Sequence, residues 1–390
     1  MKLLLYSHYF APSIGGVETI VMLLARGLAE LRASDGSREF ELTVITQTPG
    51  CQFDDQSLPF SIARKPNFWQ LLRQVKEADV IHIAGPALAP LILGLVFRKP
   101  VVVEHHGFQT ICPNGQLFIE SQGEPCPGHF MAGQHSECWN CDPSVSWFGS
   151  RRLWLLTFVR RFFSKRIAAN IMPTNWLGEQ LKLPRAITIH HGLVQILPSR
   201  KGEQQDLHAP VIAFQGRLVT TKGALVLLEA ARILCDQKLD FRLVVIGDGP
   251  EKVNLEALSE QPSLAGRVRF TGKLAPAKLE TELAQARVVV VPSLGGEVFG
   301  LVVAENMQRG IPVVASDLGS FVEVLGGTGV VFRIGDAAEL AKKISELLRS
   351  SQWMNEIVTS ERDRADKQFT VLKMVGDHRL IYQKLLKENH

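Results

Sequence analysis

The chain has 390 residues, which exceeds one ordinary hydrophobic core and fits two domains of about 150–200 residues each. Hydrophobic residues make up 46% of the sequence, so we expect a globular protein and exclude a disordered one. The formal net charge is only +4, which argues against broad nucleic-acid binding, because such proteins usually carry a clear basic excess.

The amino-terminal segment predicts a buried strand and not a signal peptide. A very short apolar run leads into a loop with His, Pro and Gly instead of a small-residue cleavage site. The longest apolar stretch, residues 87–97, is broken by Pro90 and is too short to span a bilayer. We therefore expect a cytoplasmic protein.

In the first half, short apolar runs alternate with segments whose apolar residues recur at helical spacing, such as residues 18–33. Strands this apolar are typical of a parallel sheet with helices on both faces. We predict a doubly wound α/β domain over residues 1–197. Its predicted strands are residues 3–7, 41–46, 79–84, 101–106 and 170–174.

A polar stretch, residues 198–210, interrupts this alternation and is the predicted linker. The pattern then restarts, which predicts a second Rossmann-like domain over residues 211–370 and a charged helical tail over residues 371–390. The predicted strands of the second domain are residues 211–216, 241–249, 268–272, 287–293, 311–316 and 329–333.

An insertion, residues 107–147, has few strand-like runs and holds four of the six cysteines. Six cysteines in a cytosolic chain argue against a disulfide framework, whereas a CxxC pair suits tetrahedral zinc. His129 and His135 are reserve ligands, and free or redox-active thiols are the alternative. The candidate structural zinc ligands are Cys112, Cys126, Cys138 and Cys141.

The segment 150–166 holds six basic residues, four aromatic residues and no acidic one. This composition suits an anionic membrane surface and a location at the inner face of the cytoplasmic membrane. On a helical wheel the charges scatter around the circumference, so a packed helix with snorkelling arginines is an equal alternative.

In the second half, strand ends lead into glycine-bearing loops that open helices, where open α/β sheets bind ligands. Gly216 is followed by Arg217, and Lys222 lies on the same loop. Arg217 offers a bidentate fork and Lys222 a point charge, and together they can neutralise a diphosphate. A solvated basic loop is the alternative if this loop stands alone.

Two glutamates, Glu297 and Glu305, flank a Gly-Phe-Gly corner. We predict a helix over residues 301–309, closed by Gly310, with Glu297 in the loop above its start and Glu305 just over one turn inside. The amides of Phe299, Gly300 and Leu301 would face a bound anion, and ionised carboxylates accept hydrogen bonds from diols. A nucleotide diphosphate sugar fits this arrangement.

The stretch E-V-F-G-L-V-V-A-E, followed by G-I-P-V-V-A-S, resembles the signature of the retaining GT-B glycosyltransferases of family 4, the glycosyl transferases group 1. The resemblance covers nearly the whole chain. It implies two Rossmann-like domains facing across a cleft and a C-terminal helix that crosses back to the first domain. The further matching motifs are SHYFAPSIGGVE, PVVVEHHG, ITIHHGL, FQGRLVTTKG, VVIGDGP and SDLGSFVEVLGGTGVVF.

The resemblance implies a role for each matching residue. Glu297 would contact the donor sugar and Glu305 the ribose diol, while Arg217 and Lys222 would neutralise the diphosphate. The resemblance also assigns Gly15 and Gly16 to the diphosphate and Asp248 to the loop beside the nucleobase. It places His106 near the transferred sugar, although the adjacent His105 leaves this assignment ambiguous by one residue. Asn306 and Ser320 depart from the family pattern and put the shape of the donor pocket in doubt.

The implied reaction moves a hexosyl or N-acetylhexosaminyl group from a UDP- or GDP-linked donor to a carbohydrate or lipid-linked acceptor, with retention. No Asp-x-Asp triplet occurs, so we expect chemistry without a catalytic metal or other cofactor. The alternatives are a same-fold epimerase or phosphorylase, and a non-catalytic glycan- or membrane-binding relative. A dinucleotide oxidoreductase is disfavoured because no G-x-G-x-x-G opens either domain.

Overall fold

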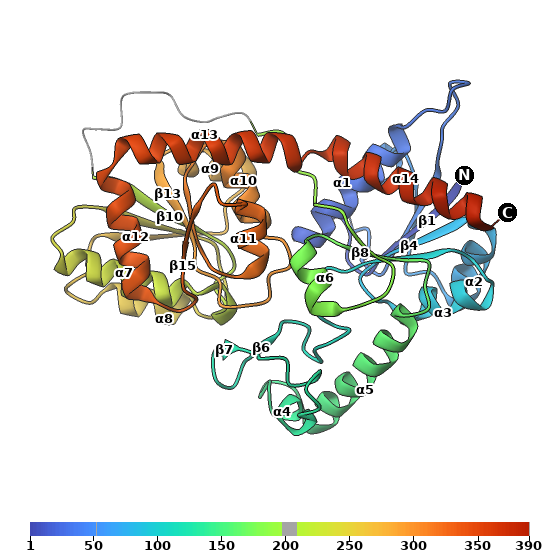
Figure 1. Cartoon of the computed structure of the whole chain (residues 1–390), viewed down its shortest axis with the longest axis horizontal. Helices are drawn as coiled ribbons and strands as arrows, with labels where there is room; N and C mark the ends of the chain where they lie inside the picture. The colour runs from blue at the N-terminus through green and yellow to red at the C-terminus, as the bar shows by residue number, and fades with distance from the viewer. Residues whose placement is uncertain (52, 197–208, 390) are drawn as a thin grey trace. The chain divides into compact units, whose positions relative to one another are not determined.

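The computed structural model describes residues 1–51, 53–196 and 209–389. The predicted linker, residues 198–210, therefore lies almost entirely outside the described residues. The chain forms two compact units. The first contains residues 1–117, 127–194 and 368–390, and the second contains residues 118–126 and 195–367. Figure 1 shows the elements of each unit.

The first unit is built on a seven-stranded sheet whose strand order is β3-β2-β1-β4-β5-β8-β9, with every pairing parallel. Parallel strands need crossover connections, which here are mostly helices. The strands are β1 (Lys2–Ser7), β2 (Glu41–Thr46), β3 (Ser61–Arg64), β4 (Val80–Ala84), β5 (Val101–Glu104), β8 (Ala169–Met172) and β9 (Ala186–Thr188). The helices are α1 (Gly16–Glu30), α2 (Phe68–Glu77), α3 (Leu88–Val96), α6 (Asn175–Leu181) and α14 (Val371–Asn389), and a short 3-10 turn is η1 (Asp55–Ser57).

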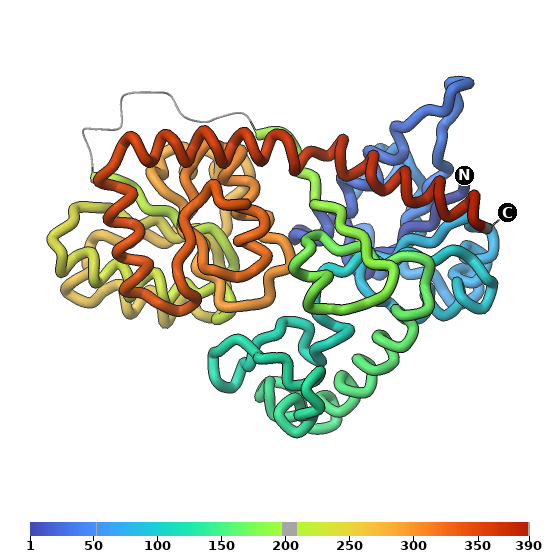
Figure 2. Tube along the Cα trace, in the orientation of Figure 1, coloured from blue at the N-terminus to red at the C-terminus, as the bar shows by residue number. Residues whose placement is uncertain are grey.

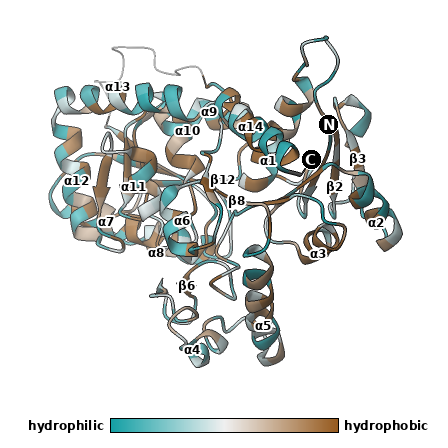
Figure 3. Ribbon diagram, turned by 45° about the vertical axis from the view of Figure 1, so that its right-hand side comes forward, coloured by the Kyte–Doolittle hydropathy of each residue, from teal (hydrophilic) through white to brown (hydrophobic). Residues whose placement is uncertain are grey.

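Five strands of this sheet are the ones predicted from the apolar runs. Their side chains form the core on both faces of the sheet, as Leu4, Val44 and Ile81 show with at most 2% exposure. The apolar runs missed β3 and β9, the two edge strands, because neither short strand has a fully buried side chain and both lack the apolar signal. Figure 3 shows the hydrophobic strands lying between helices.

The second unit contains a six-stranded parallel sheet with the order β12-β11-β10-β13-β14-β15. All six strands were predicted. They are β10 (Val211–Gln215), β11 (Arg242–Ile246), β12 (Val268–Gly272), β13 (Ala286–Val291), β14 (Val313–Ser316) and β15 (Val330–Phe332). The helices are α7 (Ala224–Asp236), α8 (Lys252–Ser259), α9 (Pro276–Leu283), α10 (Leu301–Arg309), α11 (Gly319–Leu325), α12 (Ala337–Arg349) and α13 (Ser351–Gln368), and a 3-10 turn is η2 (Thr220–Lys222).

The strand orders of both sheets reverse at their first strands, β1 and β10. In open sheets of this kind, ligands bind at the carboxyl ends of the strands near such a switch point. The two-domain α/β fold of parallel sheets predicted from the sequence is confirmed.

The cysteine-rich insertion contains little regular structure. It has a two-stranded antiparallel ribbon of β6 (Phe118–Ile119) and β7 (Glu124–Pro125), and a short helix, α4 (His135–Trp139). The basic aromatic segment that follows forms α5 (Trp147–Ser164). The trace in Figure 2 follows this course from the insertion into the helix.

The last helix, α14, belongs to the first unit and packs against α1. Tyr382 on α14 is fully buried, and Arg379 pairs with Glu39 at 2.8 Å. No helix in the described part of the chain is both long enough and apolar enough to cross a membrane.

Candidate functional site

Three loops at the carboxyl ends of β10, β11 and β13 are held against one another within the second unit. The Leu218 amide donates to the Asp248 carbonyl at 2.9 Å, and the Leu294 amide donates to the Thr221 carbonyl at 2.8 Å. Gly223 has φ +67°, and a Cβ there would collide with the Pro292 carbonyl. Only glycine therefore fits this close approach of two backbones.

Glu297 and Lys222 form a salt bridge within these loops. The Ser293 hydroxyl also donates to the Glu297 carboxylate, at 3.0 Å. The Ser320 hydroxyl, one of the two departures from the family pattern, donates to the Glu297 main-chain carbonyl at 3.2 Å. Glu297 is thus fixed at its backbone and its side chain, while 15% of the side chain remains accessible.

Glu305 lies in a network that includes Asn306. The Gln215 side chain donates to the Glu305 carboxylate at 3.5 Å, and Arg309 lies 3.6 Å from it. Burial raises the pKa of Glu305, and the nearby positive charge of Arg309 opposes that rise. The buried Asn306 amide donates to the Gln215 side-chain oxygen at 3.3 Å and so orients the group that holds Glu305.

Gln215 was not predicted from the sequence as a site residue. It is the last residue of β10 and the only polar residue of that strand, which is the signal that could have identified it. A polar side chain at the carboxyl end of a strand next to the switch point is well placed to contact a ligand.

Helix α10 begins at Leu301 and ends at Arg309, as predicted, with Gly310 at its C-terminus in the left-handed conformation. Gly300 at its N-cap has φ +95°, and no side chain caps the helix. Phe299, just before it, is 1% exposed and anchors the corner. The first amides of α10 are therefore not satisfied by a capping side chain, and the helix dipole makes this end favourable for an anion.

The other predicted donor residues lie on the neighbouring loops. Arg217, next to Gly216, is exposed, and its side chain has no hydrogen bond or ion pair within the described ranges. The Asp248 carboxylate accepts a hydrogen bond from the Gly249 amide at 2.8 Å. The second unit therefore places Arg217, Lys222 and the start of α10 on adjoining loops.

In the first unit, the loop after β1 leads to Gly15, the N-cap of α1, and Gly16, its first residue. No side chain caps this helix. The Ser13 hydroxyl donates to Glu18 at 3.0 Å, and a Cβ at Gly15 would collide with that carboxylate. Glycine at position 15 thus permits the chain to pass close to Glu18.

The two adjacent histidines after β5 have different surroundings. His105 is fully buried and lies 2.8 Å from the Asn170 side-chain oxygen, and burial lowers its pKa to about 4. The side chain of His106 keeps 7% exposure and stacks on His191. Of the two, His106 is therefore the one that can meet a ligand.

The predicted zinc ligands are divided between the units. Cys112, Cys138 and Cys141 belong to the first and Cys126 to the second. Asn114 links two of them, since the Cys112 thiol donates to its side-chain oxygen at 2.9 Å and its amide donates to the Cys141 sulfur at 3.4 Å.

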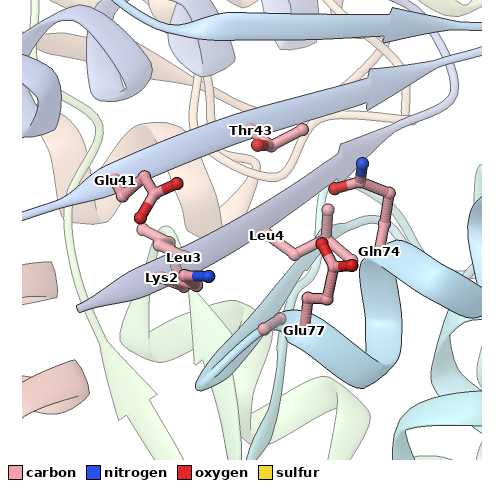
Figure 4. A pocket seen from close by; sticks show the side chains of 8 residues that line it. Lys2, Leu3, Leu4, Glu41, Thr43, Gln74 and Glu77 are labelled. Carbon is pink, nitrogen blue, oxygen red and sulfur yellow. The ribbon is translucent and has the colours of Figure 1, made fainter.

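A small cavity in the first unit is not lined by any of the candidate site residues (Figure 4). It is lined by Lys2, Glu41, Glu77 and neighbouring residues around the starts of β1 and β2. Ligands of open α/β sheets bind at the opposite ends of the strands, so we do not assign it to the site.

Comparison with known proteins identifies similar chains. Residues 197–364 match the family model described as glycosyl transferases group 1. Phosphatidyl-myo-inositol mannosyltransferase of Mycobacterium leprae (strain TN) is 37% identical over 131 residues, which cover 33% of this chain and 34% of that protein. Sulfoquinovosyl transferase SQD2 of Arabidopsis thaliana is 32% identical over 336 residues, covering 80% of this chain and 58% of that protein. The chain thus spans 34% and 58% of the lengths of these two relatives.

Among solved structures, the crystal structure of Anabaena Alr3699/HepE in complex with UDP has a TM-score of 0.73 and 18% sequence identity. The match covers 98% of this chain and all of that one. At this identity the similarity establishes the fold alone.

Proposed function

Because this chain belongs to the group 1 glycosyltransferases, we propose that it transfers a sugar from a nucleotide diphosphate donor to an acceptor hydroxyl, in the synthesis of a glycolipid or polysaccharide. The observation that carries the proposal is the arrangement in the second unit. An uncapped helix start lies between Glu297, paired with Lys222, and Glu305, held by Gln215.

Each part of this arrangement suits one part of the donor. The start of α10, with Arg217 and Lys222, supplies positive charge for the diphosphate. Glu305 accepts hydrogen bonds from the ribose diol and Glu297 from the sugar. By the family resemblance, we assign Asp248 to the loop beside the nucleobase. We assign Gly15 and Gly16 to the diphosphate and His106 to the transferred sugar by the same family resemblance.

In this proposal the reaction retains the anomeric configuration and needs no catalytic metal. Developing charge on the leaving diphosphate is stabilised by cations and helix dipoles that are fixed before the reaction. UDP is the first donor nucleotide to test, because the similar Anabaena protein was crystallised with it. GDP is the alternative.

The acceptor side includes α5, for which we propose contact with an anionic membrane surface at the inner face of the cytoplasmic membrane. Phe148, Leu155 and Phe162 recur every seven residues and are 79%, 58% and 51% exposed. Arg152 is exposed on the same helix, whereas Arg161 points inward and donates to the Leu181 carbonyl at 2.8 Å. An exposed apolar row flanked by cations suits a lipid interface.

We also propose structural zinc at the cysteine cluster. The link through Asn114 between Cys112 and Cys141 supports it, because both sulfurs contact one small side chain. Cys138 is the remaining predicted ligand in the same unit.

The transfer proposal is tested with purified protein and a panel of UDP, GDP and ADP sugars, with and without EDTA. We expect one nucleotide to raise the melting temperature relative to nucleotide-free protein in the same buffer, and its sugar conjugate to be hydrolysed slowly; EDTA should change neither the size of that rise nor the hydrolysis rate. NMR of the released sugar should show the donor's anomeric configuration. Stabilisation by no nucleotide would refute the donor site, and an inverted product would refute the retaining mechanism alone.

A further inference from the structure

The first unit encloses one glutamate, Glu104, among four histidines. Its carboxylate oxygens lie 3.2 Å from His82 Nε2 and 3.7 Å from His378 Nε2. His106 and His191 approach the same carboxylate at 3.8 and 3.5 Å. The side chains of His82, Glu104 and His378 are at most 1% exposed, so no bulk water solvates them.

The angles at the close approaches between Glu104, His82 and His378 fall short of hydrogen-bond geometry, although the 3.2 Å distance to His82 is short enough for a hydrogen bond. His82 Nε2, His378 Nε2 and both Glu104 oxygens lack a hydrogen-bond partner within the described residues. Buried polar atoms are almost always satisfied, and an unpaired buried charge is more costly still. Because His82 Nε2 and His378 Nε2 both face Glu104 Oε2, these three unsatisfied atoms indicate a missing shared partner.

The opposite ring nitrogens of both histidines are occupied. His378 Nδ1 lies 2.8 Å from the Met374 carbonyl, which can only accept, so Nδ1 carries the proton. In a neutral ring this leaves the Nε2 lone pair pointing at a carboxylate, which is repulsive. His82 Nδ1 lies 2.7 Å from the Tyr382 hydroxyl. Such partners behind the ring are typical of metal-binding histidines, because they fix the ring orientation.

The spacing of the three atoms matches ligands around one ion. Bonds of about 2.0–2.1 Å to tetrahedral zinc place two ligand atoms about 3.3 Å apart. The measured separations from Glu104 Oε2 are 3.2 Å to His82 and 3.7 Å to His378, and all three atoms lie within 4.8 Å of one another. Imidazole nitrogen and carboxylate oxygen are both zinc ligands.

We propose that His82 Nε2, Glu104 Oε2 and His378 Nε2 bind one structural Zn²⁺ ion. The ligands come from β4, β5 and α14. The ion therefore fastens the C-terminal helix to the centre of the first sheet. His106 and His191 are less suitable as zinc ligands, because His106 retains some exposure and stacks on His191. This site is separate from the cysteine cluster and does not depend on the glycosyl transfer.

The test measures zinc by mass spectrometry in full-length protein that carries Cys138→Ser and Cys141→Ser, which removes the cysteine site. We expect about one zinc per chain in this parent, and below a tenth of that after His378→Gln. His8→Gln, which changes an exposed histidine of the same unit, is the matched control and should keep the metal. Equal zinc in the His378→Gln variant and its parent, or a parent that takes up no zinc from ZnCl₂, would overturn the proposal.

A second measurement covers the case in which His378→Gln does not fold. X-ray absorption at the zinc edge of the parent should show only nitrogen and oxygen neighbours at about 2.0–2.1 Å. Removal of the ion by a chelator should lower the melting temperature and expose residues 371–389 to proteolysis, and ZnCl₂ should reverse both. Sulfur neighbours would place the ion at the remaining cysteines, and a melting temperature that does not respond to the chelator would indicate that a proton occupies the cluster. Either outcome would overturn the proposal.

Discussion

Lys222 and Glu297 are 75 residues apart in the chain and form a salt bridge at the carboxyl ends of β10 and β13. The pair joins a predicted phosphate ligand to a predicted sugar ligand. Because each charge positions the other, we expect their effects on the reaction to be coupled.

Replacing Glu297 with Gln, or Lys222 with Met, should each lower kcat about 100-fold, the range found for lost groups that stabilise a transition state. The double variant should lose little more than either single one, because removing one partner already misplaces the other. Steady-state transfer rates of the four proteins give this comparison. Effects that multiply to about 10⁴ would show that the two residues act independently.

Asn306→Ala should weaken donor binding without slowing the chemical step. The substitution removes the hydrogen bond that orients Gln215 toward Glu305, so the ribose contact is loosened. We expect KM for the donor to rise about tenfold, a loss of about 1.4 kcal/mol, with kcat little changed. Gln215→Ala should behave in the same way. A fall in kcat at constant KM would contradict this role.

Substitutions of the two adjacent histidines should have different effects, one on activity and the other on stability. His106→Asn should lower kcat with a small effect on the melting temperature. His105→Gln should lower the melting temperature, because it disturbs a buried contact with Asn170, while activity per folded molecule is retained. Thermal unfolding and transfer assays on both variants make the comparison. The reverse pattern would move the ligand-contacting role to His105.

Glu361→Gln should stabilise the protein at alkaline pH and leave it unchanged at acid pH. Burial raises the pKa of Glu361 well above its usual value, although the Val313 amide donates to one carboxylate oxygen at 3.3 Å. The folded protein therefore holds a proton that the unfolded chain loses above about pH 4.3, and stability falls as the pH rises further.

Glutamine imitates the protonated carboxyl group and removes this loss. We expect a gain on the order of 2 kcal/mol at pH 8 and none at pH 4, measured by denaturant unfolding at both values. Equal gains at both pH values would mean that packing, and not ionisation, causes the difference in the free energy of unfolding between the variant and the parent.

Replacing Phe148, Leu155 and Phe162 together with serine should reduce binding to anionic phospholipid vesicles about tenfold or more. All three side chains are exposed, so the melting temperature should change little. Val253→Ser, which changes a 77% exposed residue in the second unit, is the control and should bind as the parent does. Sedimentation with vesicles measures the binding. Undiminished binding by the triple variant would exclude α5 as the membrane contact.

The sequence predicted the sheets well because their strands are apolar on both faces. It also placed α10 correctly, since Gly300 and Gly310 mark its ends. The short edge strands β3 and β9 were missed, because none of their side chains is fully buried and local patterning is weak there.

The contacts of the candidate site were less accessible to sequence reasoning. Glu297, Glu305 and Lys222 stand in recognisable motifs, whereas Gln215 is identified by a hydrogen bond to a residue 90 positions away. Glu104 looked like one more strand residue until β4 and α14 brought His82 and His378 to it. Contacts between elements distant in the chain leave no local periodicity for a sequence to display.

The first unit is interrupted in the chain, since the second occupies the stretch between Val194 and Gln368 and α14 returns to complete the first. During synthesis, every residue of the second unit leaves the ribosome before the helix that carries His378 and Tyr382. Until α14 is synthesised, one face of the first sheet therefore remains uncovered, whereas the second unit is already complete and able to fold. Loss of the last twenty residues would consequently damage the beginning of the protein and spare its middle.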